Sequence, residues 1–179
     1  ANGPRGAIPV AVFEGADPAS QMLAVPWTVI DGPATANAFA RRVDGMTRQV
    51  PRGGTSIAGA LAFASVLFQN NAHPGDRQVI DLTADGRNNQ GPAVDQLRDL
   101  LVARGITING MVILNDDAVL DEYFEYRVIG GPDAFVEAAA DYTDYAKAIR
   151  RKLIREIRGL DIARAPARQV GALPAAAGD

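Results

Sequence analysis

Two oxygen-bearing side chains, Thr55 and Asp85, stand where α/β sheets commonly bind ligands. Asp85 follows the apolar run at residues 79–83, which the pattern predicts to be a strand buried on both faces of a parallel sheet. Thr55 belongs to a Gly-Gly-Thr-Ser turn that precedes a helical pattern. Ligands of open α/β sheets bind at the carboxyl ends of the strands. We therefore expect this hydroxyl and this carboxylate to meet at one rim.

The other residues whose side chains could bind a ligand or take part in catalysis have simpler interpretations. Asp81 lies inside the apolar strand and is costly to bury, so we expect it to be paired. Asp116 and Asp117 follow another strand and indicate a solvated loop. His73 is expected at the surface and Trp27 in strand packing. A solvated basic face on the last helix explains its cations, which are Lys147, Arg150, Arg151, Lys152, Arg155 and Arg158.

Composition limits the possible classes of function. The chain of 179 residues is 47% hydrophobic, which predicts one domain with a sizeable core. It contains no cysteine, so thiol catalysis and thiolate metal sites are excluded. The net charge of −3 gives no reason to expect nucleic acid or an anionic membrane. No apolar run is long enough to cross a bilayer, and the opening Ala-Asn-Gly-Pro-Arg is not a signal peptide.

Strands alternating with helices must position the rim. The pattern predicts a hairpin of strands at 7–13 and 21–29, then strands at 79–83, 106–114 and 134–138. Helices are expected at about 34–43, 57–68, 91–104, 120–128 and 143–158, the last with Ala146, Ile149, Leu153 and Ile157 facing inward. Asp31 or Thr35 is expected to cap the first helix, and Thr143 the last. We place the domain at 1–158 and a loose Ala/Pro/Arg tail at 159–179.

Several strings carry a family resemblance. They are DGRNNQGP at 85–92, GITING at 105–110, ILND at 113–116 and VIGGP at 128–132. Together with Thr55 they resemble the von Willebrand factor A superfamily, and more closely a bacterial von Willebrand A-like family of unknown function, over about residues 6–157. The resemblance implies an α/β, doubly wound, mostly parallel sheet with helices on both faces, similar to a Rossmann fold.

The resemblance also implies a metal-ion-dependent adhesion site. In the superfamily a divalent cation at the carboxyl rim is held by an Asp-x-Ser-x-Ser on the first strand, a Thr and an Asp, which by motif are Thr55 and Asp85 here. The sequence departs from this pattern because its only serines are Ser20, Ser56 and Ser65. Two side-chain ligands are few for Mg²⁺, Mn²⁺ or Ca²⁺, which take about six oxygens, so we expect the cation to be weakly bound or absent.

The absence of the Asp-x-Ser-x-Ser strand from this sequence implies a vacant position in the sheet. The family's first strand and helix would lie before residue 1, with that strand between the strands at 7–13 and 79–83. We expect another segment or chain to fill the slot, or the two flanking strands to close on each other, so that 79–83 is paired on both sides. Strand exchange or self-association through this position is one expectation.

Three functions remain open. The first is a non-enzymatic protein-interaction module that binds a protein partner at the Thr55 and Asp85 rim. The second is a Mg²⁺-dependent phosphoryl-transfer hydrolase, for which Asp81, Thr83 and Asp85 with Lys147 as phosphate partner would be the machinery. The third is a structural fragment of a larger assembly. By resemblance alone, the expected location is periplasmic or secreted.

Overall fold

The strands form two separate sheets. The computed structural model describes residues 6–50, 53–73 and 75–163. Strands β1 (Ile8–Gly15) and β2 (Gln21–Ile30) form an antiparallel hairpin, as predicted. Strands β3 (Gln78–Ala84), β4 (Ile106–Ile113) and β5 (Val136–Ala139) form a parallel sheet in that order. The fold is therefore mixed α/β, and the described residues form a two-stranded and a three-stranded sheet.

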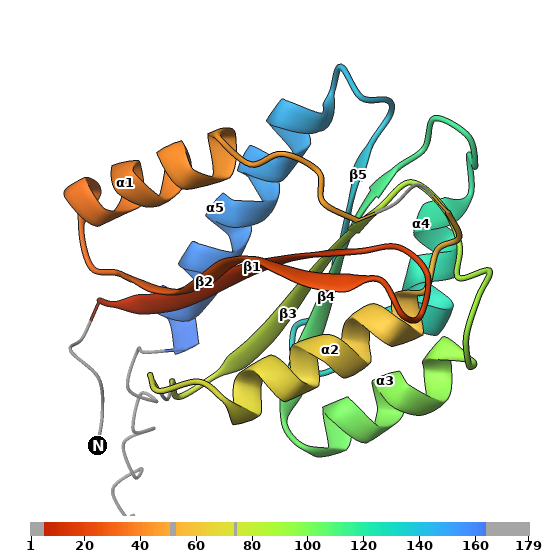
Figure 1. The fold of residues 1–179 in the computed structure, drawn as a ribbon, viewed down its shortest axis with the longest axis horizontal. Coiled ribbons are helices and arrows are strands. Elements are labelled where there is room, and N and C mark those ends of the chain that lie inside the picture. Colours follow the sequence, from red (N-terminus) through yellow and green to blue (C-terminus); the bar gives the residue numbers. More distant parts are fainter. Residues whose placement is uncertain (1–5, 51–52, 74, 164–179) are drawn as a thin grey trace, which may run out of the picture.

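Helices lie on both sides of the strands. They are α1 (Pro33–Asp44), α2 (Ile57–Gln69), α3 (Val94–Ala103), α4 (Leu120–Tyr123), the π-helical η1 (Phe124–Val128) and α5 (Tyr145–Ala163). Figure 1 shows α1 and α5 above the strands and α2 and α3 below them. The last helix continues beyond the predicted domain boundary at 158, which is a correction, and residues 164–179 lie outside the described residues.

Strand β4 is the centre of the core. All eight of its residues are buried, and it pairs with β3 on one side and β5 on the other. Gly110 lies in the middle of the strand because a β-carbon there would come within 2.6 Å of the Phe124 ring. The close contact lets η1 pack directly on β4, with Phe124 and Val128 fully buried.

Strand β3 differs from its prediction. It pairs only with β4, so among the described residues its other edge has no strand partner, and the expectation of pairing on both sides is wrong. Burial also alternates along it. Ile80 and Leu82 are buried against the core, whereas Asp81 and Thr83 are exposed. The expected burial on both faces is wrong because α5 covers the face opposite α2 only in part, with Lys152 against Asp81.

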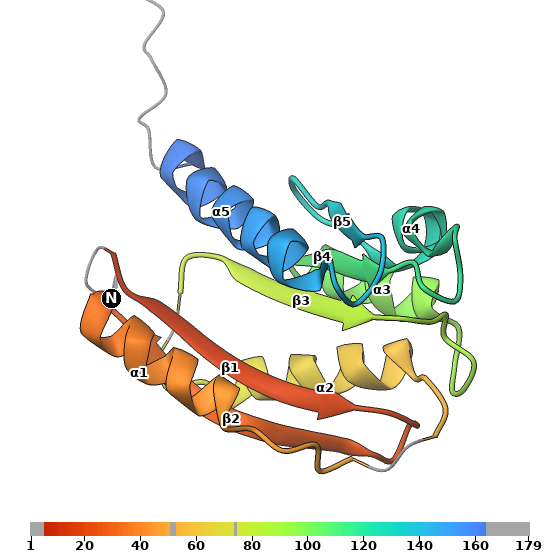
Figure 2. The same ribbon diagram turned by 90° about the horizontal axis from the view of Figure 1, so that it is seen from above.

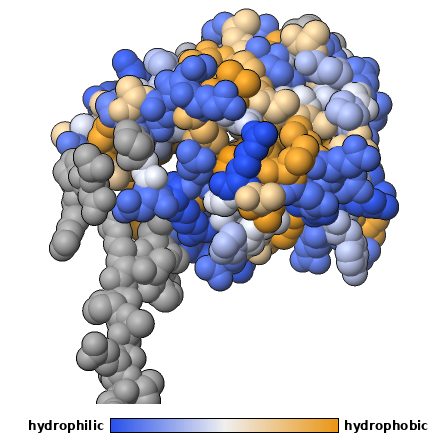
Figure 3. Space-filling view, turned by 90° about the horizontal axis from the view of Figure 1, so that it is seen from below, coloured by the Kyte–Doolittle hydropathy of each residue, from blue (hydrophilic) through white to orange (hydrophobic). Residues whose placement is uncertain are grey.

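A groove separates the two sheets, and we name it the inter-sheet groove. It has a volume of about 950 Å³ and is lined by β1, β3, α1, α2 and α5, among them Val10, Val12, Val79, Asp81, Ala60 and Leu153. Figure 2 shows α2 behind the space between β1 and β3, and the arrows of both strands point the same way. Figure 3 shows an opening on the opposite face with hydrophobic side chains near it. Direct closure of β1 onto β3 is therefore wrong for the described residues.

The apolar stripes of α1 and α5 face this groove and are not buried. Val43 of α1 is 40% exposed, and Leu153 and Ile157 of α5 are 47% and 52% exposed. The residues that α5 buries are instead Ala148 and Lys152. The predicted inward stripe of α5 is therefore wrong for Ala146, Leu153 and Ile157, whereas Ile149 packs against the buried cluster around Met111 as predicted.

Helix starts follow the predicted chemistry in part. Thr35 Oγ1 accepts from the Gly32 N–H at 3.1 Å and donates to Asp31 Oδ1 at 2.9 Å, so both predicted residues take part in the start of α1, with Gly32 as the N-cap. Before α5, Asp141 is the acceptor, since its Oδ1 receives the N–H groups of Thr143 and Asp144. Thr143 donates in this turn and is not the cap.

Candidate functional site at the carboxyl rim

Thr55 is fixed at the rim by its backbone. Its N–H donates to Asn89 Oδ1 at 2.8 Å, and its carbonyl accepts from the N–H groups of Asn89 and Gln90 at 2.9 and 3.2 Å. The helix cap is the next residue, because Ser56 Oγ accepts from the Gly59 N–H at 3.1 Å. Thr55 is therefore not the cap of α2, and its side chain is half-buried in the loop before the helix.

Asp85 lies in the neighbouring loop and has a partner that sequence analysis missed. Its Oδ2 accepts a hydrogen bond from the Tyr142 hydroxyl at 2.6 Å. A β-carbon at Gly86 would lie 4.0 Å from Thr55 Oγ1, so the Thr55 loop and the Asp85 loop are adjacent, as predicted. The rim is therefore built from three loops, which precede α2, follow β3 and follow β5.

The Asp85 hydrogen bond sets the acidity of Tyr142. Donation to Asp85 raises the pKa of the Tyr142 hydroxyl above its usual value, and partial burial and the charges of Asp85 and Asp116 add to the rise. Tyr142 is 56% exposed, so its ring is accessible while its hydroxyl is held. The rim thus presents an aromatic face beside a carboxylate.

Asp117 is not merely solvated. Arg87 Nε donates to its Oδ2 at 2.6 Å, and a second guanidinium nitrogen lies 3.3 Å from Oδ1. This contact holds the pKa of Asp117 below its usual value. Arg87 also lies 5.3 Å from the centroid of the Tyr123 ring. The loop after β3 is therefore tied to the loop after β4, which sequence analysis did not predict beyond placing both at strand ends.

The donor set at the rim fits a divalent cation poorly. Thr55 and Asp85 offer two side-chain oxygens, and the Asp85 carboxylate already accepts from Tyr142. Within the described residues, no group of three His, Asp or Glu side chains is placed to hold a metal ion. Mg²⁺ and Ca²⁺ take about six or more oxygens, so a cation here would need ligands beyond these residues.

A second polar cluster lies at the inter-sheet groove. Lys152 is 1% exposed, and its ammonium pairs with Asp81 and, at 2.7 Å, with Glu156 Oε1. Asn109 Nδ2 donates to the same Glu156 oxygen at 2.7 Å and its Oδ1 accepts from the Phe135 N–H at 3.2 Å. The predicted pairing of Asp81 is confirmed, whereas the solvated position predicted for Lys152 is wrong.

Burial sets the charge state of this cluster. It raises the pKa of Glu156 to about 7, and the neighbouring Asp81 adds to the rise while Lys152 opposes it. Two carboxyl groups beside one ammonium cannot both ionise at low cost in a partly buried site. Near neutral pH the cluster therefore holds a partly protonated Glu156, which no local sequence signal predicts.

The residues of the hydrolase hypothesis have different partners. Asp81 pairs with Lys152 at the groove, whereas Asp85 accepts from Tyr142 at the rim. Lys147 is exposed at the start of α5.

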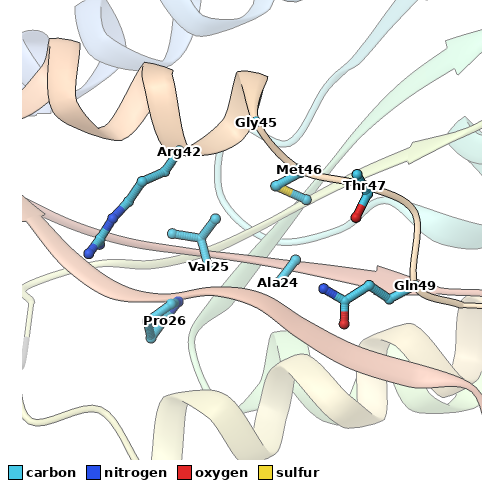
Figure 4. A pocket seen from close by; sticks show the side chains of 8 residues that line it. All are labelled: Ala24, Val25, Pro26, Arg42, Gly45, Met46, Thr47 and Gln49. Carbon is cyan, nitrogen blue, oxygen red and sulfur yellow. The ribbon is translucent and has the colours of Figure 1, made fainter.

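A smaller pocket of about 330 Å³ lies between β2 and the end of α1 (Figure 4), lined by Ala24, Val25, Pro26, Arg42, Gly45, Met46, Thr47 and Gln49. It lies apart from both polar clusters and contains no carboxylate.

Comparisons with known proteins place the sequence in a family. A family model described as "Protein of unknown function (DUF1194)" matches residues 1–161. No curated protein matches the chain. Among the described residues, no helix is both long enough and apolar enough to cross a membrane.

One solved structure has a similar fold at low sequence identity, and two others match more weakly. A second crystal form of proximal thread matrix protein 1 from the mussel byssus is 16% identical, with a TM-score of 0.51 over 79% of this chain. Another structure of that protein gives 21% identity and a TM-score of 0.44 over 59%. An uncharacterized membrane spanning protein from Vibrio fischeri gives 16% and 0.32, over 87% of this chain and 76% of its own. The chain spans about a third or less of the mussel protein, at 32% and 26% in the two structures.

Proposed function

Because the chain belongs to the family of proteins of unknown function DUF1194, we propose that it is a non-enzymatic protein-interaction module of the von Willebrand A type. It binds a protein partner at the carboxyl rim, where Thr55 and Asp85 lie. The observation that carries the proposal is the convergence of three loops on Asp85, with Tyr142 exposed beside it. Aromatic rings beside a fixed polar group are common anchors of protein interfaces.

We also propose how the two sheets are related. The hairpin and the parallel sheet are two halves of one doubly wound sheet whose middle strand is not among the described residues. The support is that β1 and β3 point the same way across the inter-sheet groove and that helices lie on both sides of both halves. The proposed location, periplasmic or secreted, rests on the family resemblance alone.

The cation is a separate part of the proposal. With two side-chain oxygens in place, Mg²⁺, Mn²⁺ or Ca²⁺ should bind weakly or not at all. Calorimetric titration with MgCl₂ and MnCl₂ measures this directly. Micromolar affinity that disappears in Asp85→Ala would mean that other residues complete the site.

Site-specific photo-crosslinking tests partner binding at the rim. Tyr142→benzoylphenylalanine places the cross-linker at the rim, and Leu100→benzoylphenylalanine places it on α3, at a residue that is 58% exposed. In extracts of cells that produce the protein, we expect discrete adducts from position 142 that Asp85→Ala reduces, and none of these from position 100. Identical adducts at both positions would reject the rim as the interface.

A phosphatase assay tests the second candidate function, in which Asp85 is part of a hydrolase. The substrate is p-nitrophenyl phosphate with Mg²⁺, and the variants are Asp85→Ala and Lys147→Ala. We expect no turnover above that of a buffer blank. Turnover that both substitutions remove would favour the hydrolase over the interaction module.

A further inference from the structure

The contact between Arg87 and Asp117 shows how this molecule holds a guanidinium. Arg87 Nε donates to Asp117 Oδ2 at 2.6 Å, and a second nitrogen lies 3.3 Å from Oδ1. The same guanidinium lies 5.3 Å from the centroid of the Tyr123 ring. A carboxylate and an aromatic ring thus hold the two chemical surfaces of one guanidinium, its N–H edge and its flat face.

A second pairing of a carboxylate with a tyrosine ring lies at the rim. Tyr142 donates its hydroxyl to Asp85 Oδ2 at 2.6 Å. Tyr142 is 56% exposed, and Asp85 is exposed beside it. Within residues 6–50, 53–73 and 75–163, no cationic side chain forms an ion pair with Asp85. This pair therefore repeats the acceptor parts of the Arg87 contact, and no described residue supplies the cation.

The electrostatic environment of this pair is negative. Asp116 is exposed in the loop after β4, and its charge adds to that of Asp85 in raising the pKa of the Tyr142 hydroxyl. Asp117 is neutralised by Arg87, whereas Asp116 forms no ion pair with any residue that the structure describes. A carboxylate of a partner would be repelled here, and a cation would be attracted.

We propose that the carboxyl rim binds its protein partner through an arginine side chain, whose guanidinium lies on the Tyr142 ring and donates to Asp85. The inference rests on the proposed interaction module and names the chemistry of its partner. Oδ2 of Asp85 accepts from Tyr142, and Oδ1 receives the arginine. Because the tyrosine hydroxyl holds the ring and the carboxylate in one arrangement, less side-chain freedom is lost on binding.

Arginine fits the pair better than other cations do. Its planar guanidinium stacks on aromatic rings and presents several N–H donors at its edge, whereas a lysine ammonium is a compact and strongly hydrated charge. A divalent cation takes about six oxygens, and Thr55 and Asp85 offer two side chains. Since the pair is exposed, stacking on the ring should change affinity by about two- to fivefold.

A set of capped peptides tests this chemistry. The probe is Gly-Ser-Gly-Arg-Gly-Ser-Gly, and matched peptides carry citrulline, Lys or Glu in place of Arg. Citrulline keeps the shape of the arginine side chain and loses its charge. Binding is followed by NMR of the chain labelled with ¹³Cζ-tyrosine. In these spectra Tyr142 reports on the rim, and Tyr126 of η1, which is 76% exposed, is the reference.

The Arg peptide should shift the signal of Tyr142 and not that of Tyr126. We expect a dissociation constant on the order of 1 mM for this single contact. The citrulline and Glu peptides should bind at least about tenfold more weakly, and the Lys peptide about threefold. An unmoved Tyr142 signal at about 20 mM Arg peptide, or equal binding of the citrulline peptide, overturns the proposal.

Two pairs of variants locate the contact, with binding followed by the amide signals of residues 85–89. Asp85→Asn should weaken Arg-peptide binding at least about tenfold. Asp76→Asn makes the same change of charge before β3, at the other end of the strand, and should change binding less than about twofold. Tyr142→Leu should weaken binding about threefold, and Tyr126→Leu should leave it unchanged. Equal effects within either pair overturn the proposal.

Thermal melts check that the variants fold. The comparison of the Arg and citrulline peptides needs no variant, so it decides the question even where a substitution prevents folding. A further arm adds MgCl₂ to the Glu peptide. Binding that requires Mg²⁺ and is lost in Asp85→Ala would mean that the partner supplies a carboxylate through a cation, which overturns the proposal.

Cross-linking from position 142 separates this inference from the proposed function. Adducts that depend on Asp85, without binding of the Arg peptide, would overturn the arginine contact and leave the interaction module standing. Binding of the Arg peptide without such adducts would support the contact and reject the module.

Discussion

Asp85 and Tyr142 are 57 residues apart in the sequence, yet they share the 2.6 Å hydrogen bond that shapes the rim. The sequence could predict Asp85, because an Asp-Gly pair after an apolar run marks the end of a strand. It could not predict Tyr142, because an exposed tyrosine after a short strand has no local signature. The same holds for Lys152, whose burial depends on Asp81 in β3 and Glu156 one helical turn away.

The shared hydrogen bond predicts the titration of Tyr142. In Asp85→Asn the acceptor loses its charge, so the pKa of Tyr142 should fall toward the ordinary value of a tyrosine. NMR of ¹³Cζ-labelled tyrosine resolves this residue. Thr55→Val is the control, since the Thr55 side chain is not among the causes of the shift. An unchanged Tyr142 pKa in Asp85→Asn would show that the hydrogen bond does not persist in solution.

Glu156 predicts a pH dependence of stability. Its folded pKa of about 7 lies above the ordinary 4.5, so its contribution is fully present below about pH 4.5 and is lost as pH rises through 7. In Glu156→Gln this loss should disappear, which makes the variant more stable relative to the unaltered chain at pH 8 than at pH 5, by on the order of 1 kcal/mol after screening. Urea melts at both pH values measure the difference. A gap that widens toward acid would contradict the assigned direction.

At the scale of elements, local patterns predicted where helices and strands form but not which faces are covered. Helix α2 and strand β4 match their predictions because their periodicity and their flanking turn residues are local. The faces of β3 and α5 were predicted wrongly because apolar residues indicate a covered face without showing what covers it. Leu153 and Ile157 have the spacing of a buried stripe, but in the described residues they border the inter-sheet groove and stay exposed.

Gly110 tests the packing of η1 on β4. An alanine there would bring its β-carbon within 2.6 Å of the buried Phe124 ring and 3.3 Å of Ile129, so both must move. Gly110→Ala should lower the free energy of unfolding by about 1–3 kcal/mol. Gly53→Ala is the control, because the nearest atom, Asp17 Oδ2, is 3.9 Å away and the expected change is within about 0.5 kcal/mol. Similar stability of the two variants would show that η1 adjusts freely.

At the scale of the whole molecule, the two sheets are held together through α2. The hairpin contacts this helix through Phe13 with Phe63 and Trp27 with Phe68, and the Trp27 indole donates to the Leu67 carbonyl at 3.2 Å. No residue of β1 is buried, in contrast to β4. The parallel sheet therefore carries the core, and the hairpin is its less protected neighbour.

This asymmetry predicts the order of local opening. Amide exchange of the chain alone should be slowest in β4 and faster in β1 and β2, because a two-stranded hairpin with little burial opens at a lower free energy than the core. Mass spectrometry of peptic fragments measures this. The same exchange rate in β1 and β4 would show that the two sheets unfold as one cooperative unit.

The burial of Lys152 has a practical consequence for labelling the protein. Lys147 and Lys152 are the only lysines in the sequence. Lys147 is exposed, whereas the Lys152 amine is enclosed by Asp81, Glu156 and the surrounding side chains. An amine-reactive dye should therefore modify one lysine per folded chain, five residues after Tyr142, and reach the second only after unfolding. Besides its α-amino group, the folded protein thus carries one reactive lysine, close in sequence to Tyr142 of the candidate rim, and a second lysine whose labelling reports on loss of structure.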